Sequence, residues 1–208
     1  MVPIASMAER AGVAGMLGTV YLRLGRRPEA RAQYKKAVKD GTGYVVDNAA
    51  VNLGLFDFFD AKYESAVAWF DQAIGSADAS ARWIAVKYRA LSLKASGDIA
   101  AAIPALEEAL RIGPAAERSW IEYRLVRVLL DAGREDKARP HLEAIEADPD
   151  ADAEDRAYAA FDLGVWWLRR GDKQRAWSFL QFAANSGTEV ADEAALRLRQ
   201  LQTVNGQA

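Results

Sequence analysis

The sequence contains no cysteine and a single histidine, His141. Thiolate catalysis, disulfides and the usual zinc or copper sites all require these side chains. We therefore expect no disulfide framework and no transition-metal site. His141 follows Pro140 on an expected surface helix, and an isolated surface histidine is typical of a solvated residue rather than a catalytic one.

Recognisable catalytic motifs are missing as well. The sequence has no glycine-rich phosphate loop, no Gly-x-Ser-x-Gly elbow and no His-Glu-x-x-His pair. The densest carboxylate cluster, between residues 146 and 155, lacks the spacing and the glycine of a calcium loop, so we interpret it as a solvated acidic turn. These absences predict a non-catalytic protein without a cofactor and without catalytic or metal-ligating residues.

The chain also lacks a strong net charge and a long apolar run. Its 27 basic and 29 acidic residues leave a formal net charge of -2, whereas nucleic-acid binding needs a concentrated cationic surface. No apolar stretch approaches the roughly 20 residues of a transmembrane helix. The start of the chain is interrupted by Glu9 and Arg10 and is a poor secretory signal. We expect no nucleic-acid partner and no membrane insertion; the compartment stays open.

What the sequence does contain is a repeated spacing of small residues. The repeated offsets are 0, 7, 12, 16 and 19, and the clearest copy consists of Gly164, Gly171, Ala176, Leu180 and Ala183. The five copies begin at Gly18, Gly54, Ala90, Val126 and Gly164. A period of 36 to 38 residues is typical of repeat architectures in which each copy is one supersecondary unit.

Each copy predicts two helices joined by a short turn. Gly97-Asp98 and Gly171-Asp172 combine a residue that can end one helix in the left-handed conformation with a residue that can cap the next. Small residues allow the two helices to cross closely, and the large residue at offset 16 fills the space beside them. Because one hairpin cannot bury its own apolar face, the hairpins must stack into a solenoid.

This pattern resembles the tetratricopeptide repeat family. The matching residues include Leu17-Gly18-x-x-Tyr21 with Ala30, Tyr34 and Ala37; Asn52-Leu53-Gly54 with Ala66, Phe70 and Ala73; and Leu163-Gly164-x-x-Trp167 with Ala176, Leu180 and Ala183. The resemblance implies an all-α fold, a right-handed α-solenoid of five helix-turn-helix repeats over residues 1–187. Residues 188–208 are expected to form a C-terminal capping helix and tail, with an apolar stripe of Val190, Ala194, Leu198 and Leu201.

Several positions depart from the family pattern. Asp57 stands where the family usually has an aromatic residue. Arg89 and Glu122 occupy expected apolar positions, and either they pair with each other or one or both reach solvent. Pro104 and Pro140 fall inside expected second helices, which predicts a slight bend or a late helix start at each.

In the family that the chain resembles, the first helices of the repeats line a concave groove. Helical geometry then assigns the groove-facing positions. These are Asn48, Asn52, Leu55, Phe59, Lys87, Tyr88, Leu91, Trp120, Tyr123, Arg124, Arg127, Tyr158, Phe161 and Asp162. Aromatic rings and arginine are favoured at protein interfaces, and the basic middle of the set predicts an acidic or carboxylate-bearing ligand. The alternative is that stacking buries these rings between neighbouring helices.

The sequence therefore predicts a protein–protein interaction module, an adaptor or assembly scaffold that binds a peptide or helix of a partner protein. One alternative is a homo-oligomeric scaffold that associates through the uncharged residues 1–8 and the apolar helix after them. A further alternative is the regulatory module of a larger enzyme or export complex. The sequence does not distinguish these by any catalytic or ligand motif.

Overall fold

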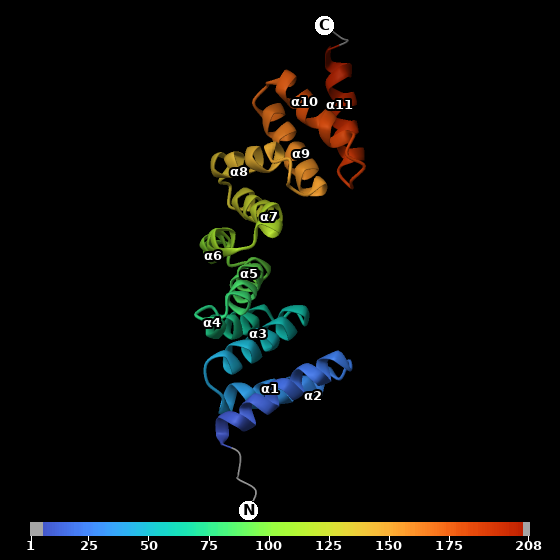
Figure 1. Ribbon diagram of the computed structural model, residues 1–208. Coiled ribbons are helices and arrows are strands. Elements are labelled where there is room, and N and C mark those ends of the chain that lie inside the picture. Colours follow the sequence, from blue (N-terminus) through green and yellow to red (C-terminus); the bar gives the residue numbers. More distant parts are fainter. Residues whose placement is uncertain (1–5, 206–208) are drawn as a thin grey trace, which may run out of the picture. The chain divides into compact units, whose positions relative to one another are not determined.

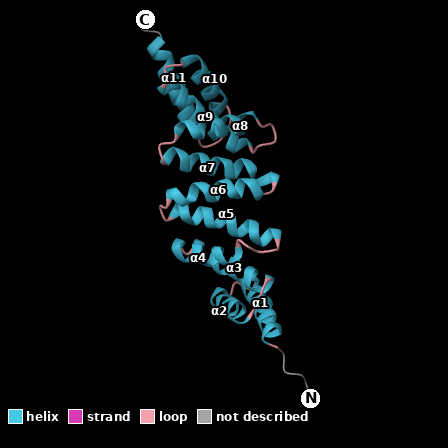
Figure 2. Cartoon of the chain, turned by 90° about the vertical axis from the view of Figure 1, so that its left-hand side faces the viewer, coloured by secondary structure: helices cyan, strands magenta, loops and turns pink. Residues whose placement is uncertain are grey.

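The computed structural model describes residues 6–205, and within this range the regular structure is entirely helical (Figures 1 and 2). The chain divides into two compact units, Met1–Ile112 and Gly113–Ala208, which we call unit 1 and unit 2. The predicted all-α fold is confirmed. Part of the predicted uncharged edge at residues 1–8, and the end of the predicted tail, lie outside the described residues.

Unit 1 consists of consecutive helical hairpins. Its helices are α1 (Met7–Arg23), α2 (Arg27–Asp40), α3 (Tyr44–Phe59), α4 (Tyr63–Ala73), α5 (Ala79–Ala95) and α6 (Ile99–Ile112). The two helices of each hairpin pack together, and the first helix of the next hairpin packs on the second helix of the one before it, as α3 does on α2. This is the stacking that the repeat spacing predicts.

Unit 2 contains two hairpins and a last helix. After the short 3₁₀ helix η1 (Ala115–Glu117), the helices are α7 (Arg118–Asp131), α8 (Glu135–Ala147), α9 (Ala153–Arg169), α10 (Lys173–Ala184) and α11 (Ala191–Asn205). Helix α11 packs on α10. The expected apolar stripe of α11 is present, since Val190, Ala194, Leu198 and Leu201 join a cluster with Leu180 and Ala183.

The recurring glycines allow the close helix crossing that the sequence predicts. A Cβ atom at Gly54 would lie 2.6 Å from the Phe70 ring, and one at Gly164 would lie 2.6 Å from Leu180. Phe70 and Leu180, at offset 16 of their copies, are fully buried. The first position of these copies is therefore glycine because the large residue of the second helix lies directly on it.

The hairpin turns use the left-handed backbone conformation. Gly97 and Gly171 have φ values of +87° and +79°, and the following Asp98 and Asp172 accept hydrogen bonds from Ala101 N and Arg175 N. The second hairpin places Ala61 in this conformation, with φ of 56°. The helices on both sides impose this backbone on a residue that does not favour it.

Of the slight bend or late helix start that was predicted at the two prolines, the structure excludes the late start. Helix α6 begins at Ile99 and α8 begins at Glu135, so Pro104 and Pro140 both lie inside regular helix. Each proline removes one helix hydrogen bond. Both side chains are exposed, so the carbonyl that loses its partner lies near solvent, which lowers the cost.

Asp57, at the position where an aromatic residue was expected, is buried within unit 1. Its carboxylate forms an ion pair with Arg31 of the preceding hairpin and accepts hydrogen bonds from Ser65 Oγ at 2.6 Å and Trp69 Nε1 at 3.0 Å. Burial by itself would raise the pKa of Asp57. The hydrogen bonds from Ser65, Arg31 and Trp69, with the Arg31 charge, outweigh burial and hold this pKa below its ordinary value.

Arg89 and Glu122, which were expected either to pair with each other or to reach solvent, each have a partner within their own unit. Arg89 Nε donates to the Asp71 carboxylate. Glu122 is nearly buried, and its Oε1 lies 2.8 Å from His141 Nδ1. The prediction that His141 is simply solvated is corrected by the same contact, since the ring is only partly exposed and covers the Glu122 carboxylate.

Candidate protein-binding surfaces

The first helices of the first two hairpins enclose an apolar hollow in unit 1. Its volume is about 320 Å³, and its lining consists of Gly12, Gly15, Met16, Thr19, Tyr44, Val45 and Asn48. Tyr44 and Met16 are exposed at its rim. The Thr19 hydroxyl already bonds to Tyr34 Oη at 3.1 Å. The hollow therefore offers space and apolar contact rather than free polar groups.

Two asparagines extend this hollow along α3. Asn52 Nδ2 donates to the Asn48 carbonyl oxygen at 2.8 Å and to Asn48 Oδ1 at 3.3 Å. Within the described residues, the Asn52 side-chain oxygen has no hydrogen-bond partner. Because one helical turn separates the two residues, the contact fixes the orientation of both amides. Asn52 is thus positioned to accept a hydrogen bond from a ligand backbone.

An aromatic group lies between α3 and α5 in the same unit. The Phe59 ring lies edge-on to Phe58 at 5.4 Å and to Tyr88 at 6.2 Å, and Phe58 and Tyr88 are 5.2 Å apart. Phe59 is 67% exposed, whereas Tyr88 is partly buried against the core. Lys87 Nζ lies 5.9 Å from the Tyr88 ring centre. Phe59 is therefore the ring of this group that a partner can reach.

The remaining predicted positions of unit 1 contribute less. Leu55 is half-buried and packs against the core cluster around Phe70. Leu91 is half-buried on α5. Both side chains are partly covered by their neighbours, so they offer a partner less contact than the exposed Phe59 ring does.

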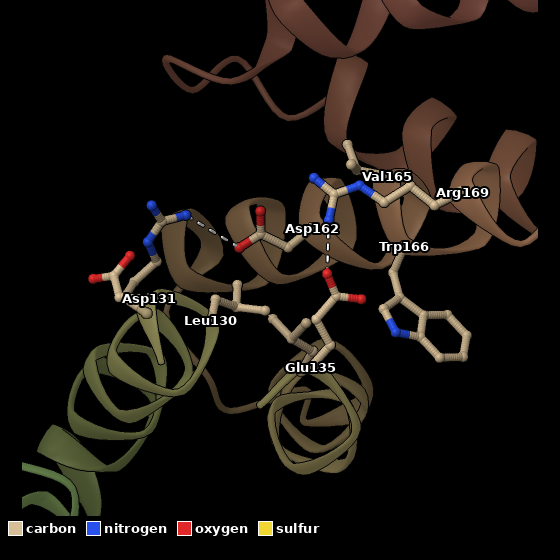
Figure 3. A pocket seen from close by; sticks show the side chains of 9 residues that line it. Leu130, Asp131, Glu135, Asp162, Val165, Trp166 and Arg169 are labelled. Carbon is tan, nitrogen blue, oxygen red and sulfur yellow. Dashed lines mark hydrogen bonds and ion pairs between the residues drawn. The ribbon is translucent and has the colours of Figure 1, made fainter. Parts of the chain in front are cut away.

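Unit 2 contains a polar hollow of about 250 Å³ between α7, α8 and α9 (Figure 3). It is lined by Arg127, Leu130, Asp131, Glu135, Leu142, Asp162, Val165, Trp166 and Arg169. Figure 3 shows Arg169 extending to Glu135, where the Nη1–Oε1 distance is 2.8 Å. Arg127 Nη1 lies 3.8 Å from Asp162 Oδ2. The positive charge of each arginine in this hollow is therefore balanced by a neighbouring carboxylate.

Asp162 is the most enclosed charged group of this hollow, with 14% of its side chain exposed. Tyr123 Oη donates to its Oδ2 at 3.1 Å. Burial raises the pKa of Asp162, and the Arg127 charge and the Tyr123 hydrogen bond oppose the rise only in part. Burial and the neighbouring Asp162 charge likewise raise the pKa of Tyr123. Tyr123 is buried and holds Asp162 in place rather than facing solvent.

The other predicted residues of unit 2 have specific neighbours. The Arg124 guanidinium lies 4.5 Å from the Trp120 ring centre. The Tyr158 ring is 5.5 Å from that of Tyr123, and its hydroxyl donates to Glu189 Oε2 at 3.2 Å. Phe161 is half-buried against the cluster that α10 and α11 form. The Phe161 ring thus packs against neighbouring helices, whereas the Trp120 and Tyr158 rings contact the side chains of Arg124 and Tyr123.

The structure thus joins the predicted residues into local groups within each unit. Asn48 and Asn52 are one group, Phe59 with Tyr88 and Lys87 a second, and Tyr123, Arg127, Tyr158 and Asp162 a third. Sequence reasoning missed Tyr44 and Met16 at the apolar hollow, and Glu135, Trp166 and Arg169 at the polar one. Tyr44 lies one helical turn before Asn48, so the same helical spacing could have identified it.

Metal coordination and membrane insertion are two further properties that bear on the kind of site. Among the described residues, no group of His, Cys, Asp or Glu side chains is arranged to hold a metal ion. In that same part of the chain, no helix is long and apolar enough to span a membrane. The surfaces described above consist of rings, amides and paired charges, which suit a protein ligand.

Comparison with known proteins identifies the family. Two family models, both described as tetratricopeptide repeat, match residues 16–82 and 93–161, together more than half of the chain. The chain belongs to the tetratricopeptide repeat family. A tetratricopeptide repeat chain is a protein–protein interaction module, and the solenoid of helical hairpins expected from the sequence is confirmed as the fold class. No curated protein matches the sequence significantly.

Solved structures support the same fold. The match to a crystal structure of MamA covers 81% of this chain and 93% of the MamA chain, with 19% identity and a TM-score of 0.66. YrrB, described as a TPR protein with an unusual peptide-binding site, covers 90% of both chains with 18% identity and a TM-score of 0.68. Pseudomonas aeruginosa pilF covers 96% of this chain and 98% of its own, with 16% identity and a TM-score of 0.63. At these identities the similarity concerns the fold alone.

Proposed function

We propose that this tetratricopeptide repeat protein is a non-catalytic adaptor or assembly scaffold that binds a peptide or helix of a partner protein. The observation that carries the proposal is the apolar hollow of about 320 Å³ between α1 and α3, with Asn48 in its lining. Small apolar hollows next to oriented amides are typical of peptide-binding surfaces. The unusual peptide-binding site described for YrrB supports this type of function for the fold.

The ligand is held by contacts of different kinds. A large apolar side chain fills the hollow beside Tyr44, and the Asn52 side-chain oxygen accepts a hydrogen bond from the ligand backbone. The exposed Phe59 ring adds a second apolar contact further along α3. Tyr44 and Phe59 each present a large ring with only two side-chain dihedral angles to order on binding, so each makes an efficient anchor.

We also propose that the surface of unit 1 accommodates an acidic ligand residue beside Lys87. Lys87 Nζ lies 5.8 Å from the Trp83 ring centre and 5.9 Å from the Tyr88 ring centre, and its positive charge adds to that end of the surface. Charge complementarity of this kind sets orientation and association rate more than affinity.

A peptide selection tests this function. Random peptides displayed on phage are selected against the wild-type protein, and the enriched peptides are titrated against the Tyr44→Ala and Asn52→Ala variants. We expect Tyr44→Ala to weaken binding about tenfold or more, which corresponds to about 1.4 kcal/mol, and Asn52→Ala to weaken it less. Replacing acidic peptide residues by their amides should reduce the association rate.

The matched control is Phe182→Ala, which removes another exposed aromatic ring from the second helix α10. It should leave peptide affinity unchanged. If selection enriches no peptide, or if both unit 1 variants bind the enriched peptides as well as the wild type does, the proposed site is wrong.

A further inference from the structure

Helix α1 carries a second apolar face that nothing in the described residues covers. Ala11, Ala14 and Gly18 are buried on its inner side. The exposed large apolar residues of α1 and its C-cap that share one stripe are Val13, Met16, Leu17, Val20 and Leu24. Their spacing of i, i+3, i+4, i+7 and i+11 places them on one side of a helix. A helix that is apolar on opposite sides is normally buried on both.

The repeat itself shows what this face does in other copies. Thirty-six residues after Val13, Leu17 and Val20 stand Ala49, Leu53 and Phe56 of α3. All three are buried in one cluster with α2, the second helix of the preceding hairpin. In α9 the equivalent residues Ala159 and Leu163 are also fully buried. The stripe on α1 is therefore a helix-docking face, and α1 is the first helix of its unit (Figure 1).

The charges at the two ends of the stripe indicate what docks there. Glu9 and Arg23 are 14 residues apart, almost four turns and about 21 Å along the helix, so both lie on the exposed side. Arg23 has no ion-pair partner among the described residues. Glu9 accepts from Ser6 N with Oε2, which leaves its other oxygen open. The stripe is thus acidic at one end and basic at the other.

We propose that the exposed face of α1 is the interface of a symmetric dimer of this chain, in which the two α1 helices pack antiparallel. A two-fold axis next to Met16 brings each Glu9 to the partner's Arg23, and Val13 to the partner's Val20. One surface is then complementary to itself in both charge and apolar contact, as an isologous interface requires. Tyr44 is not part of this interface, although Met16 also lines the peptide hollow. The inference goes beyond the proposed function because it names a second copy of this chain as the partner of the stripe.

A head-to-tail contact with the other end of the chain fits less well. The exposed side of α11 carries Asp192, Glu193, Arg199 and Gln200, with Leu196 as its exposed large apolar residue within residues 191–202. Such a face offers no apolar stripe to match that of α1. The dimer therefore closes on itself instead of extending into a filament.

The size of the contact predicts its strength. Stable interfaces bury about 800 Å² per partner, and a contact centred on one helix is at the small end of this range. We therefore expect association that depends on protein concentration in the micromolar range. Sedimentation velocity over a concentration series should show a monomer–dimer equilibrium for the wild type. The Val13→Ser/Val20→Ser double variant should raise the dissociation constant at least tenfold, with helix content by circular dichroism unchanged.

Cysteine cross-linking tests the antiparallel geometry directly, because the chain has no cysteine of its own. Met16 and Leu24 are equally exposed, at 64% and 65%. In the Met16→Cys variant the two thiols lie near the two-fold axis, within reach of a disulfide. With an added oxidant this variant should rapidly form a disulfide-linked dimer. Leu24→Cys lies far from its own copy in an antiparallel pair and should cross-link slowly.

Other outcomes overturn the proposal. Equal cross-linking of the two variants indicates a parallel pair or random collision, and a wild type that stays monomeric at all concentrations excludes self-association. A dimer that Val13→Ser/Val20→Ser leaves intact has its interface elsewhere. Leu196→Ser, which changes an exposed leucine of α11, serves as the control and should sediment like the wild type. Tyr44 lies outside the stripe, so Tyr44→Ala can be titrated with peptide at protein concentrations where the wild type is monomeric. That titration tests the proposed function separately from the dimer.

Discussion

Single residues decide how closely the helices of this protein approach. Gly54 and Gly12 both lie inside helices, but their surroundings are opposite. A Cβ atom at Gly54 would lie within 2.8 Å of three Phe70 ring atoms, whereas one at Gly12 would meet nothing within 4 Å. Of these two positions, only Gly12 can therefore gain the stability that alanine normally adds to a helix relative to glycine.

We expect Gly54→Ala to destabilise the protein by about 1–3 kcal/mol, because the new methyl group overpacks a fully buried ring. Gly12→Ala should stabilise it by about 0.5–1 kcal/mol through helix propensity. Urea unfolding followed by circular dichroism measures both. A Gly54→Ala protein as stable as the wild type would show that the crossing can relax, contrary to the proposed role of the glycine.

At the scale of elements, the last helix α11 covers the end of unit 2. Leu201 is buried in the cluster with Leu180, Ala183 and Ala194, while Leu196 of the same helix is exposed. This difference supports the proposal that residues 188–208 act as a cap on the repeats of residues 1–187. A cap needs one apolar side for the last hairpin and one polar side for solvent.

The two leucines provide a matched test of the cap. Leu201→Asp should cost about 3 kcal/mol or more, because it removes a buried side chain and places a carboxylate in an apolar cluster. Leu196→Asp should change the free energy of unfolding by about 0.5 kcal/mol or less. Chemical denaturation of both variants measures the difference. Similar costs for the two substitutions would mean that α11 does not cap α10 through Leu201.

At the scale of the whole molecule, each unit contains an enclosed carboxylate, and the pKa shifts of the two are opposite: Asp57 is buried, and 14% of the Asp162 side chain is exposed. The pKa of Asp57 in unit 1 is lowered because Ser65, Arg31 and Trp69 outweigh burial. The pKa of Asp162 in unit 2 is raised because burial outweighs Arg127 and Tyr123. A lowered pKa adds stability that is complete above the unfolded value of about 3.9 and is lost in acid. A raised pKa has the reverse effect.

These signs predict the pH dependence of stability in two variants. The stability that Asp57 contributes relative to Asp57→Asn should shrink as the pH falls below about 4. Relative to Asp162→Asn, the wild type should become more stable as the pH falls from neutral through the raised pKa, because the folded protein takes up the proton first. Urea denaturation across this pH range measures both differences. If the stability of the wild type relative to Asp57→Asn and that relative to Asp162→Asn both rise, or both fall, as the pH decreases, the opposite pKa shifts assigned to Asp57 and Asp162 are wrong.

The amino-acid sequence alone determined the repeat and the fold class, because hairpin geometry imposes small residues at regular offsets. The resulting helices, turns and crossings follow from local properties such as the left-handed preference of Gly171 and the capping ability of Asp172. Helical spacing also identified Asn52 and Phe59 on the candidate surface. The same spacing predicts which face of each helix is apolar, including the second apolar face of α1.

Tertiary structure decided which of these groups meet and which stay exposed. Arg89 pairs with Asp71 and Glu122 with His141, and Tyr123 is buried against Asp162. Partners of this kind depend on side-chain reach across packed helices. The apolar hollow beside Tyr44 depends on the separation of two helices, which residue spacing does not encode. Only packing shows that the stripe of Val13, Leu17 and Val20, buried at its repeat equivalents, has no covering helix in the described chain.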